Sequence, residues 1–196
     1  MEYAIALTGG ISTGKSTVSN ILKLYRFEVI DADEISHLVL DGCWEEIIKM
    51  YGQEYVDNKK VNRKKLGKLV FDNKEERKRL EALLHPLIRE EIQKRAAMSE
   101  KHKIPYFIDI PLFFETKAYD IKRVLVVYAP RELQIERTIK RDNLSFEEAQ
   151  KRVDSQIDIE EKKKMATYVI ENTKDIGFLT QQVEEFKRKI SADFKI

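Results

Sequence analysis

The sequence is poor in cysteine, proline and glycine. Its 196 residues include one cysteine, four prolines and seven glycines. The lone Cys43 excludes a disulfide framework and a zinc site built from cysteines, and it fits a reducing cytosol. No run approaches the ~18 consecutive apolar residues of a membrane span, and the first apolar run begins so early that we expect no signal peptide. We therefore expect a cytoplasmic protein with no membrane partner.

An excess of charge of either sign is also missing. The chain has 36 Lys and Arg against 34 Asp and Glu, a formal net charge of +2. A dedicated nucleic-acid binder would show a clustered basic excess, so we expect no nucleic-acid partner. Two charge runs, Asn58–Lys65 and Glu160–Lys164, are interpreted as solvated surface rather than as recognition patches.

Short apolar runs alternate with long amphipathic segments, a pattern typical of an α/β fold with a parallel sheet. Strands are expected at Tyr3–Thr8, Glu28–Asp31, Tyr106–Ile110, Val124–Tyr128 and Tyr168–Glu171. Helices are expected at Lys15–Tyr25, Ala32–Val39, Trp44–Tyr51, Arg63–Phe71, Glu75–Leu84, Leu87–Met98, Arg131–Arg141, Phe146–Ile157 and Gly177–Ile190. Pro86 and Pro130 are each expected to open a new helix, and Ser145 with Glu148 predicts a capping box.

The spacing between the expected strands is uneven. About seventy-five residues separate the second strand from the third, which is more than one crossover helix needs. We interpret residues 33–98 as a helical insert that forms a substrate-binding subdomain within a single domain, residues 1–196. The charge-dense helical segment 131–164 is interpreted as a lid that closes over a bound donor.

The segment Leu7–Thr17 carries the strongest motif of the chain. Residues 9–16 fit the pattern G-x-x-x-x-G-K-[ST] between an apolar run and an amphipathic helix. The backbone N–H groups of such a loop surround a phosphate, and the helix N-terminus adds partial positive charge. Lys15 is expected to reach the β- and γ-phosphates, and the Ser16 hydroxyl to bind Mg²⁺. The segment therefore predicts binding of a nucleoside triphosphate.

Three acids follow expected strands. Asp31 and Asp33 come at the end of the second strand, where a carboxylate could orient an acceptor hydroxyl and take its proton. Each is equally interpretable as a helix N-cap, and Asp33 is favoured as the functional one because Asp31 still belongs to the strand. Asp109 comes at the end of the apolar run of the third expected strand and is a candidate Mg²⁺ partner.

One expected helix carries polar side chains on a single face. Gln134, Arg137 and Arg141 are spaced at i, i+3 and i+7. Guanidinium groups on this face could neutralise charge on a transferring phosphoryl group. The alternative is a solvated face on which Glu132 and Glu136 are the ion-pair partners.

Two other classes of nucleotide-binding protein fit less well than a small-molecule kinase. A GTPase switch needs D-x-x-G, but no glycine of this chain has aspartate three positions before it, and residues 172–175 place lysine one position late for N-K-x-D. A nucleic-acid-stimulated ATPase is disfavoured by the interspersed charges. The chain is therefore interpreted as a small-molecule kinase, and one class that remains open is a kinase acting on a nucleotide or a sugar acid.

Several motifs together resemble the dephospho-coenzyme A kinase family over nearly the whole chain. They are Ala6–Ile11 leading into the phosphate loop, Val29–Asp33, Leu84–Ile88, Ile110–Glu115, Gln134-x-x-Arg137-x-x-x-Arg141-Asp142, Arg152-x-x-x-Gln156 and Ala166–Asn172. The family usually has Gly then Ser where this chain has Ser12 and Thr13, so Ser12 must adopt a backbone conformation that glycine accepts more easily.

The resemblance implies an α/β P-loop kinase fold with a five-stranded parallel sheet, a helical coenzyme-A-binding insert and a helical lid. It implies transfer of the ATP γ-phosphate to the ribose 3′-hydroxyl of dephospho-coenzyme A, the last step of coenzyme A biosynthesis. Asp33, Lys15 and Arg141 are the implied catalytic residues, and Ser16 and Asp109 are expected at Mg²⁺. ATP is expected to contact Gly9, Gly10, Ser12, Thr13, Gly14, Lys15, Ser16, Thr17, Arg137 and Arg141. The acceptor is expected to contact Thr8, Asp31, Asp33, His85 and Glu115.

Overall fold

The computed structural model describes residues 1–195, and these form two compact units. Among these residues, the core unit comprises Met1–Ile30 and residues 96–195, and the insert unit comprises Asp31–Arg95. Within residues 1–195, no helix combines the length and the apolar character needed to cross a membrane.

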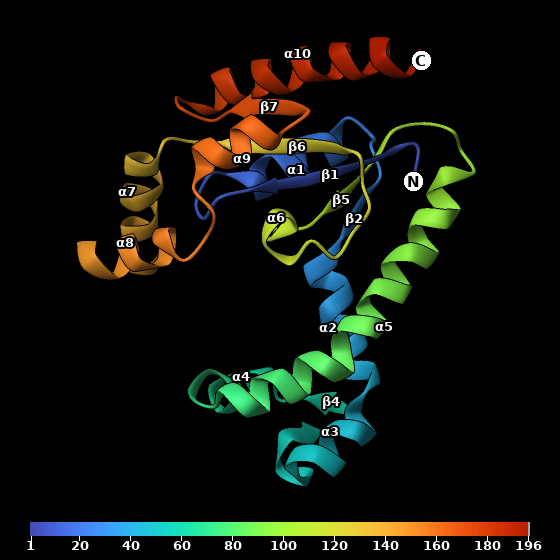
Figure 1. Ribbon diagram of the computed structural model, residues 1–196, viewed down its shortest axis with the longest axis vertical. Helices are drawn as coiled ribbons and strands as arrows, with labels where there is room; N and C mark the ends of the chain where they lie inside the picture. The colour runs from blue at the N-terminus through green and yellow to red at the C-terminus, as the bar shows by residue number, and fades with distance from the viewer. Residues whose placement is uncertain (196) are drawn as a thin grey trace. The chain divides into compact units, whose positions relative to one another are not determined.

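The core unit is built on a five-stranded parallel sheet with the strand order β2-β5-β1-β6-β7 (Figure 1). The central strand β1 lies between β5 and β6, so that Ala6 is opposite both Ile108 and Val124. The strands are β1 (Ala4–Gly9), β2 (Val29–Asp31), β5 (Tyr106–Asp109), β6 (Arg123–Tyr128) and β7 (Tyr168–Glu171). This confirms the predicted α/β class and all five expected strands, within a residue or two at their ends.

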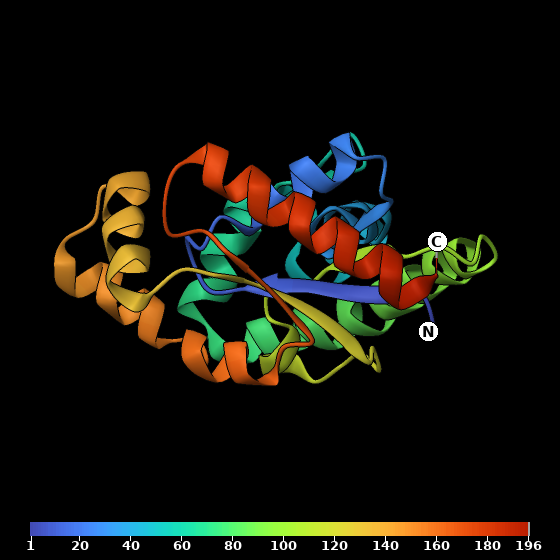
Figure 2. The same cartoon turned by 90° about the horizontal axis from the view of Figure 1, so that it is seen from above.

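The helices of the core unit pack on the sheet and beyond its end. They are α1 (Lys15–Leu24), α6 (Phe113–Thr116), α7 (Arg131–Asp142), α8 (Phe146–Asp154), α9 (Ile159–Met165) and α10 (Ile176–Phe194). Helices α7 and α8 lie side by side near the end of β6, and α10 lies along the sheet (Figures 1 and 2). The end of the sheet where β1 and β6 finish is therefore the end that carries the phosphate loop and α7.

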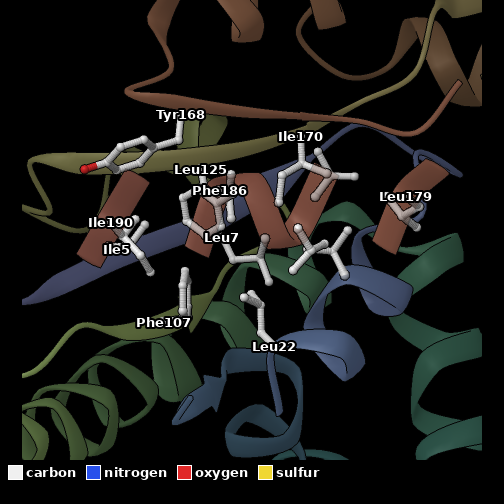
Figure 3. Close-up of a cluster of buried hydrophobic side chains, with 13 residues drawn as sticks. Ile5, Leu7, Leu22, Phe107, Leu125, Tyr168, Ile170, Leu179, Phe186 and Ile190 are labelled. Atoms are coloured by element: carbon white, nitrogen blue, oxygen red, sulfur yellow. The ribbon is translucent and has the colours of Figure 1, made fainter. Parts of the chain in front are cut away.

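The main core lies between the sheet and helices α1 and α10 (Figure 3). Its side chains include Leu7 of β1, Leu22 of α1 and Val183 of α10, all fully buried. Burial of a side chain of this size contributes about 1.5–3 kcal/mol relative to exposure. This packing fixes α1 against β1, and so fixes both ends of the loop that joins them.

Glu100 connects the N-terminus to β5. Its carboxylate accepts hydrogen bonds from the N–H groups of Glu2 and Tyr3 and from the Tyr106 hydroxyl, each 3.0 Å long. Burial alone would raise the pKa of Glu100, but these three hydrogen bonds together lower the pKa below its ordinary value of 4.5. The carboxylate form is therefore the one that the folded protein stabilises.

The insert unit has its own apolar core around Ile47, Val56, Val61 and Leu66. Its elements are α2 (Ala32–Gly42), α3 (Trp44–Tyr51), the 3-10 helix η1 (Gln53–Tyr55), β3 (Val56–Asp57), β4 (Lys60–Val61), α4 (Arg63–Asp72) and the first part of α5 (Lys74–Glu100).

The run 58–65, expected to be solvated surface, contains part of a β-hairpin. Asn58 and Lys59 both have positive φ, 49° and 60°, and form the turn between β3 and β4. The hairpin turns Val61 into the core of the insert, where it is 6% exposed. The hairpin was missed because each of its strands has only two residues, too few to show an alternating pattern.

The expected helix boundary at Pro86 is wrong. Helix α5 is continuous from Lys74 to Glu100 and contains Pro86 in its interior. A proline there removes one backbone hydrogen bond, to the carbonyl of Ala82, and crowds that carbonyl. The remaining turns of this 27-residue helix are enough to carry that local cost. By contrast, Pro130 does precede α7 as its N-cap residue, as expected.

Candidate active site

The phosphate loop joins β1 to α1 through a left-handed residue. Gly14 has φ +91° and is the N-cap of α1. A Cβ placed on Gly14 would lie 2.1 Å from the Nδ2 atom of Asn172. The Asn172 amide is that close because it donates a hydrogen bond of 2.9 Å to the Thr13 carbonyl. Glycine at this position is thus required both by the backbone angle and by the neighbouring side chain.

The first part of the loop is held by one hydrogen bond from within the loop and one from outside it. The Gly10 carbonyl accepts from the Thr13 hydroxyl at 2.9 Å. The Ile11 N–H donates to the Oε1 atom of Gln156 at 2.9 Å, and Gln156 lies in the link between α8 and α9. These hydrogen bonds fix the orientation of the peptide between Gly10 and Ile11.

Ser12 has the left-handed backbone expected for it, with φ 55°. Its hydroxyl lies 2.9 Å from the hydroxyl of Thr138, which in turn lies 2.7 Å from the Gln134 carbonyl. The carbonyl must receive the single Thr138 proton, so the Ser12 hydroxyl is the donor to Thr138. This contact with α7 offsets part of the conformational cost of a non-glycine residue in the left-handed region.

Lys15 contacts the carboxylate of Asp109. Asp109, at the end of β5, is 3% exposed, and the Lys15 side chain is 20% exposed. The adjacent Ser16 is exposed on the first turn of α1. The structure thus brings together the predicted phosphate-binding lysine and the predicted metal-binding acid. No group of three or more His, Cys, Asp or Glu able to hold a metal lies within residues 1–195.

The three residues of the predicted polar face of α7 differ in how exposed they are to solvent. Gln134 is buried, and its amide donates to the Ala129 carbonyl at 2.9 Å. Arg137 is half-buried and donates from Nη2 to the Asn172 carbonyl at 3.0 Å, while its buried Nη1 has no partner among the described residues. Arg141 is exposed. Gln134 packs so closely on the loop that a Cβ on Gly10 would lie 2.4 Å from its Oε1.

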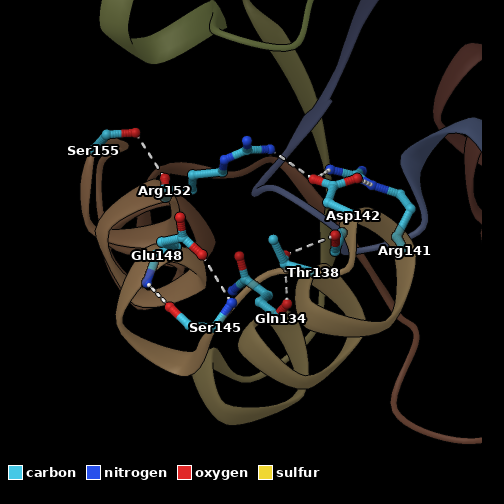
Figure 4. Close-up of polar contacts among 9 residues, drawn as sticks. Gln134, Thr138, Arg141, Asp142, Ser145, Glu148, Arg152 and Ser155 are labelled. Atoms are coloured by element: carbon cyan, nitrogen blue, oxygen red, sulfur yellow. Dashed lines mark hydrogen bonds and ion pairs between the residues drawn. The ribbon is translucent and has the colours of Figure 1, made fainter.

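Arg141 and Arg152 share one carboxylate, that of Asp142 (Figure 4). Arg141 donates to both oxygens at 2.8 and 2.9 Å, and Arg152 donates at 2.8 Å. The Arg141 guanidinium, helped by Arg152, holds the pKa of Asp142 below its ordinary value. The predicted capping box of Ser145 and Glu148 is confirmed at the start of the neighbouring α8. Glu136 pairs with Lys140 rather than with an arginine of the face.

The expectation that the charge run 160–164 is solvated is wrong for its central lysine. Lys162 is fully buried, although Lys164 of the same run is exposed. The Lys162 ammonium donates to the Gly9 carbonyl at 2.9 Å and lies 2.7 Å from Oε1 of Glu115. Glu115 Oε1 also accepts from the Ile157 N–H at 3.2 Å, and Glu115 Oε2 is buried with no partner among residues 1–195.

The remaining predicted acceptor-binding residues lie on several elements. Thr8, buried at the end of β1, donates its hydroxyl to the Pro111 carbonyl at 3.0 Å. In the insert unit, Asp31 is the N-cap of α2 and accepts from the N–H groups of Asp33 and Glu34. Asp33 itself is exposed on the first turn of α2, and His85 is exposed on α5.

Sequence reasoning gave no role to four residues that shape the loop. Thr138 and Lys162 were missed because a buried partner cannot be read from a polar helical pattern. Gln156 and Asn172 stand within motifs of the family resemblance, and that was the one signal that pointed to them.

These features define a P-loop phosphotransferase: a strand leads into a phosphate loop bounded by glycines, and the loop leads into a helix N-terminus. A lysine at that N-terminus lies beside an acid at the end of a neighbouring strand. Comparison with known proteins narrows this class. The family model of dephospho-CoA kinase matches residues 3–177. Dephospho-CoA kinase of Sulfurimonas denitrificans is 53% identical over 193 residues, covering 98% of this chain and 96% of the relative. That of Wolinella succinogenes is 49% identical over 198 residues, with 100% and 98% covered.

Solved structures agree with this assignment. Dephospho-CoA kinase from Campylobacter jejuni superposes with a TM-score of 0.82 at 40% identity, covering 97% of this chain and 98% of that one. Shikimate kinase from Acinetobacter baumannii shares the fold, with a TM-score of 0.53 at 18% identity. The superposition covers 97% of this chain and 93% of that one. This chain belongs to the dephospho-CoA kinase family, whose members catalyse the final, ATP-dependent step of coenzyme A biosynthesis.

Proposed function

We propose that residues 9–17 hold the triphosphate of ATP, that Asp33 takes the proton of the acceptor hydroxyl, and that the insert unit binds dephospho-coenzyme A. The 3′-oxygen of the acceptor ribose forms a bond to the γ-phosphorus while the bond to the β-phosphate oxygen breaks, and ADP leaves. The single observation that carries the nucleotide part is the loop itself, closed by Gly14 with Lys15 at the start of α1.

Lys15 is the loop residue that the triphosphate would attract most strongly. Its ammonium already has an anionic partner in Asp109, so it is held at the start of α1 rather than free in solvent. The Ser16 hydroxyl and the Asp109 carboxylate are hard oxygen donors of the kind that Mg²⁺ prefers, and Mg²⁺ usually takes only one or two protein ligands beside phosphates and water. When bound there, Mg²⁺ would neutralise charge on the β- and γ-phosphates.

Helix α7 supports a role in binding the transferring phosphoryl group. Arg141 and Arg152 are exposed, and each forms an ion pair with the carboxylate of Asp142. Exposed ion pairs of this kind contribute little to stability, about 0–1 kcal/mol. Phosphate oxygens could therefore replace Asp142 as the partner of Arg141 at little cost. The buried Nη1 of Arg137 has a donor that a phosphate would satisfy.

Asp33 is the better candidate for the catalytic carboxylate because Asp31 is already used. Asp31 satisfies two N–H groups at the start of α2, at 2.9 and 3.1 Å. This is the N-cap role that the sequence left open for either acid. The Asp33 carboxylate is exposed and so remains available to accept a proton.

The insert unit has side chains suited to a long, partly apolar and partly anionic acceptor. Lys65 lies over the Tyr55 ring at 4.7 Å, and Lys59 over the Trp44 ring at 5.5 Å. Such pairs combine an apolar surface with positive charge. Thr8, Asp31, His85 and Glu115 are proposed as further acceptor contacts on the strength of the family motifs. The single cysteine and the small-molecule substrates support a cytoplasmic location.

Replacement of Asp33 with asparagine tests the assignment. Asparagine is nearly isosteric but cannot accept the hydroxyl proton, so kcat should fall by about 10²–10⁴-fold with little change in either KM. The matched control is Asp31→Asn, which keeps a carboxamide oxygen for the N-cap and should change kcat far less. If Asp33→Asn raised KM and left kcat intact, Asp33 would be a binding residue and the proposal would fail.

A further inference from the structure

A fully buried lysine lies behind the phosphate loop. Lys162 has no exposed surface, although Glu160, Glu161 and Lys164 of the same charge run in α9 are exposed. Removing an ammonium group from water is costly unless a partner compensates it. The two compensating groups are the Glu115 carboxylate at 2.7 Å and the Gly9 carbonyl at 2.9 Å. A buried ion pair is seldom more stabilising than an apolar pair of similar size, so stability alone is a weak reason for it.

The Gly9 carbonyl belongs to the first peptide of the phosphate loop. Glycine is needed on both sides of this peptide, because a Cβ on Gly9 would lie 2.8 Å from the Val127 carbonyl and one on Gly10 would lie 2.4 Å from Gln134. Two adjacent glycines, however, leave the torsions that orient the peptide least restricted. Because the peptide is planar, holding its carbonyl also holds its N–H.

The next peptide of the loop is held from the same part of the chain. Its carbonyl, on Gly10, accepts from Thr13, and its N–H, on Ile11, donates to Gln156. Gln156 precedes α9, and the neighbouring Ile157 N–H donates to the same Glu115 oxygen that Lys162 contacts. Residues 156–162 thus fix two consecutive peptides of the phosphate loop.

We infer that Lys162 is a positioning residue of the phosphate loop: its ammonium, oriented by Glu115, fixes the peptide between Gly9 and Gly10 in the conformation that binds phosphate. This inference rests on the proposed nucleotide-binding function of residues 9–17. Lys162 acts through the backbone and contacts no substrate. Glu115 contributes by balancing the charge of the ammonium and directing it at the Gly9 carbonyl.

A double variant separates this role from simple charge balance. Lys162→Met leaves the partly buried Glu115 carboxylate without its cation, so this variant should be strongly destabilised. Lys162→Met with Glu115→Gln removes both charges and should recover most of the stability in urea unfolding. It should still bind a fluorescent ATP analogue about tenfold or more weakly, measured without acceptor, because the Gly9 carbonyl has lost its donor. The control pair is Lys164→Met with Glu161→Gln, an exposed pair on the same helix.

The outcomes are distinguishable. If the double variant bound the analogue within twofold of the wild type, Lys162 would be a charge-balancing residue and the inference would be overturned. If the wild type itself bound no nucleotide, or if Lys15→Ala bound it as well as the wild type, the proposed function would fail instead.

A measurement on the wild type decides the matter even if the variants do not fold. With ¹⁵N-lysine and ¹³C-glycine labelling, a scalar coupling across the hydrogen bond from Lys162 Nζ to the Gly9 carbonyl carbon is expected both without and with nucleotide. Its absence in the nucleotide-bound protein would overturn the inference.

Discussion

Replacing Gly14 with alanine should loosen the phosphate loop where it enters α1. The new Cβ would lie 2.1 Å from the Nδ2 atom of Asn172, far inside contact distance, and Gly14 has φ +91°. The protein can respond only by moving the Asn172 amide, which breaks its hydrogen bond to the Thr13 carbonyl. The change therefore acts through two separable terms, the backbone angle and the displaced amide.

Both terms have an expected size. A side chain in the left-handed region costs about 1–2 kcal/mol. Asn172 is 9% exposed and Thr13 is fully buried, so leaving their polar groups unpaired costs about 1–3 kcal/mol. The sum is about 2–5 kcal/mol of the free energy of unfolding. A domain of ordinary stability, about 5–15 kcal/mol, remains folded after such a loss.

A double-mutant cycle measures the second term alone. Asn172→Ala removes the amide that a Cβ at position 14 would meet, and only the Asn172 Cβ remains, at 4.0 Å. In that background Gly14→Ala should cost only the backbone term of about 1–2 kcal/mol, so the coupling energy should be about 1–3 kcal/mol. Urea unfolding followed by far-UV circular dichroism supplies the four free energies.

Gly67→Ala is the control for the substitution itself. Gly67 lies inside α4, and a Cβ added to it would have nothing within 4 Å. Alanine there should stabilise the helix by about 0.5–1 kcal/mol. If Gly14→Ala cost the same with and without the Asn172 amide, the proposed close packing of the loop on Asn172 would be refuted.

Three further predictions concern other parts of the core unit. Thr138→Val should lower the free energy of unfolding by about 1 kcal/mol in the wild type. It should lower it distinctly less in a Ser12→Gly background, where the Ser12 hydroxyl is already absent. Equal losses in the two backgrounds would contradict the Ser12–Thr138 contact. Glu100→Gln should destabilise the protein at pH 7 by about 1–3 kcal/mol. Because the folded pKa of Glu100 lies below 4.5, this loss of stability should be constant above pH 4.5 and vanish as the pH falls through the folded pKa. A loss that does not depend on pH would mean that the charge of Glu100 is unimportant for stability. Hydrogen exchange of helices α7 and α8, residues 131–154, should slow when an ATP analogue binds, as expected for a lid. Equal protection with and without the analogue would indicate a fixed pair of helices.

The fold could be predicted well because its signals are local. Strands buried on both faces appear as short apolar runs, and the phosphate loop is a contiguous motif, so β1, α1 and their junction followed from the sequence. The failures arose where one local rule was overridden. Pro86 lies inside a helix long enough to tolerate it, and the strands β3 and β4 are too short to show a period.

The candidate site could be predicted only in part. Lys15 was expected at the β- and γ-phosphates and Asp109 at the Mg²⁺ ion, and the structure places the two side chains in contact. The burial of Lys162 could not be foreseen, because α9 gives five consecutive charged residues, from Glu160 to Lys164, with no sign of which one turns inward. Burial of that lysine depends on Glu115, more than forty residues earlier in the chain.

The choice of acceptor tests the central claim most directly. ATP-dependent phosphorylation of dephospho-coenzyme A, adenosine monophosphate and adenosine should be measured at equal concentration, since all three offer a ribose 3′-hydroxyl. Binding energy from the pantetheine arm, supplied by the insert unit, should make dephospho-coenzyme A by far the best acceptor in kcat/KM. If adenosine monophosphate were phosphorylated equally well, the insert would not recognise the arm, and a general nucleoside or nucleotide kinase would be the better description of this chain.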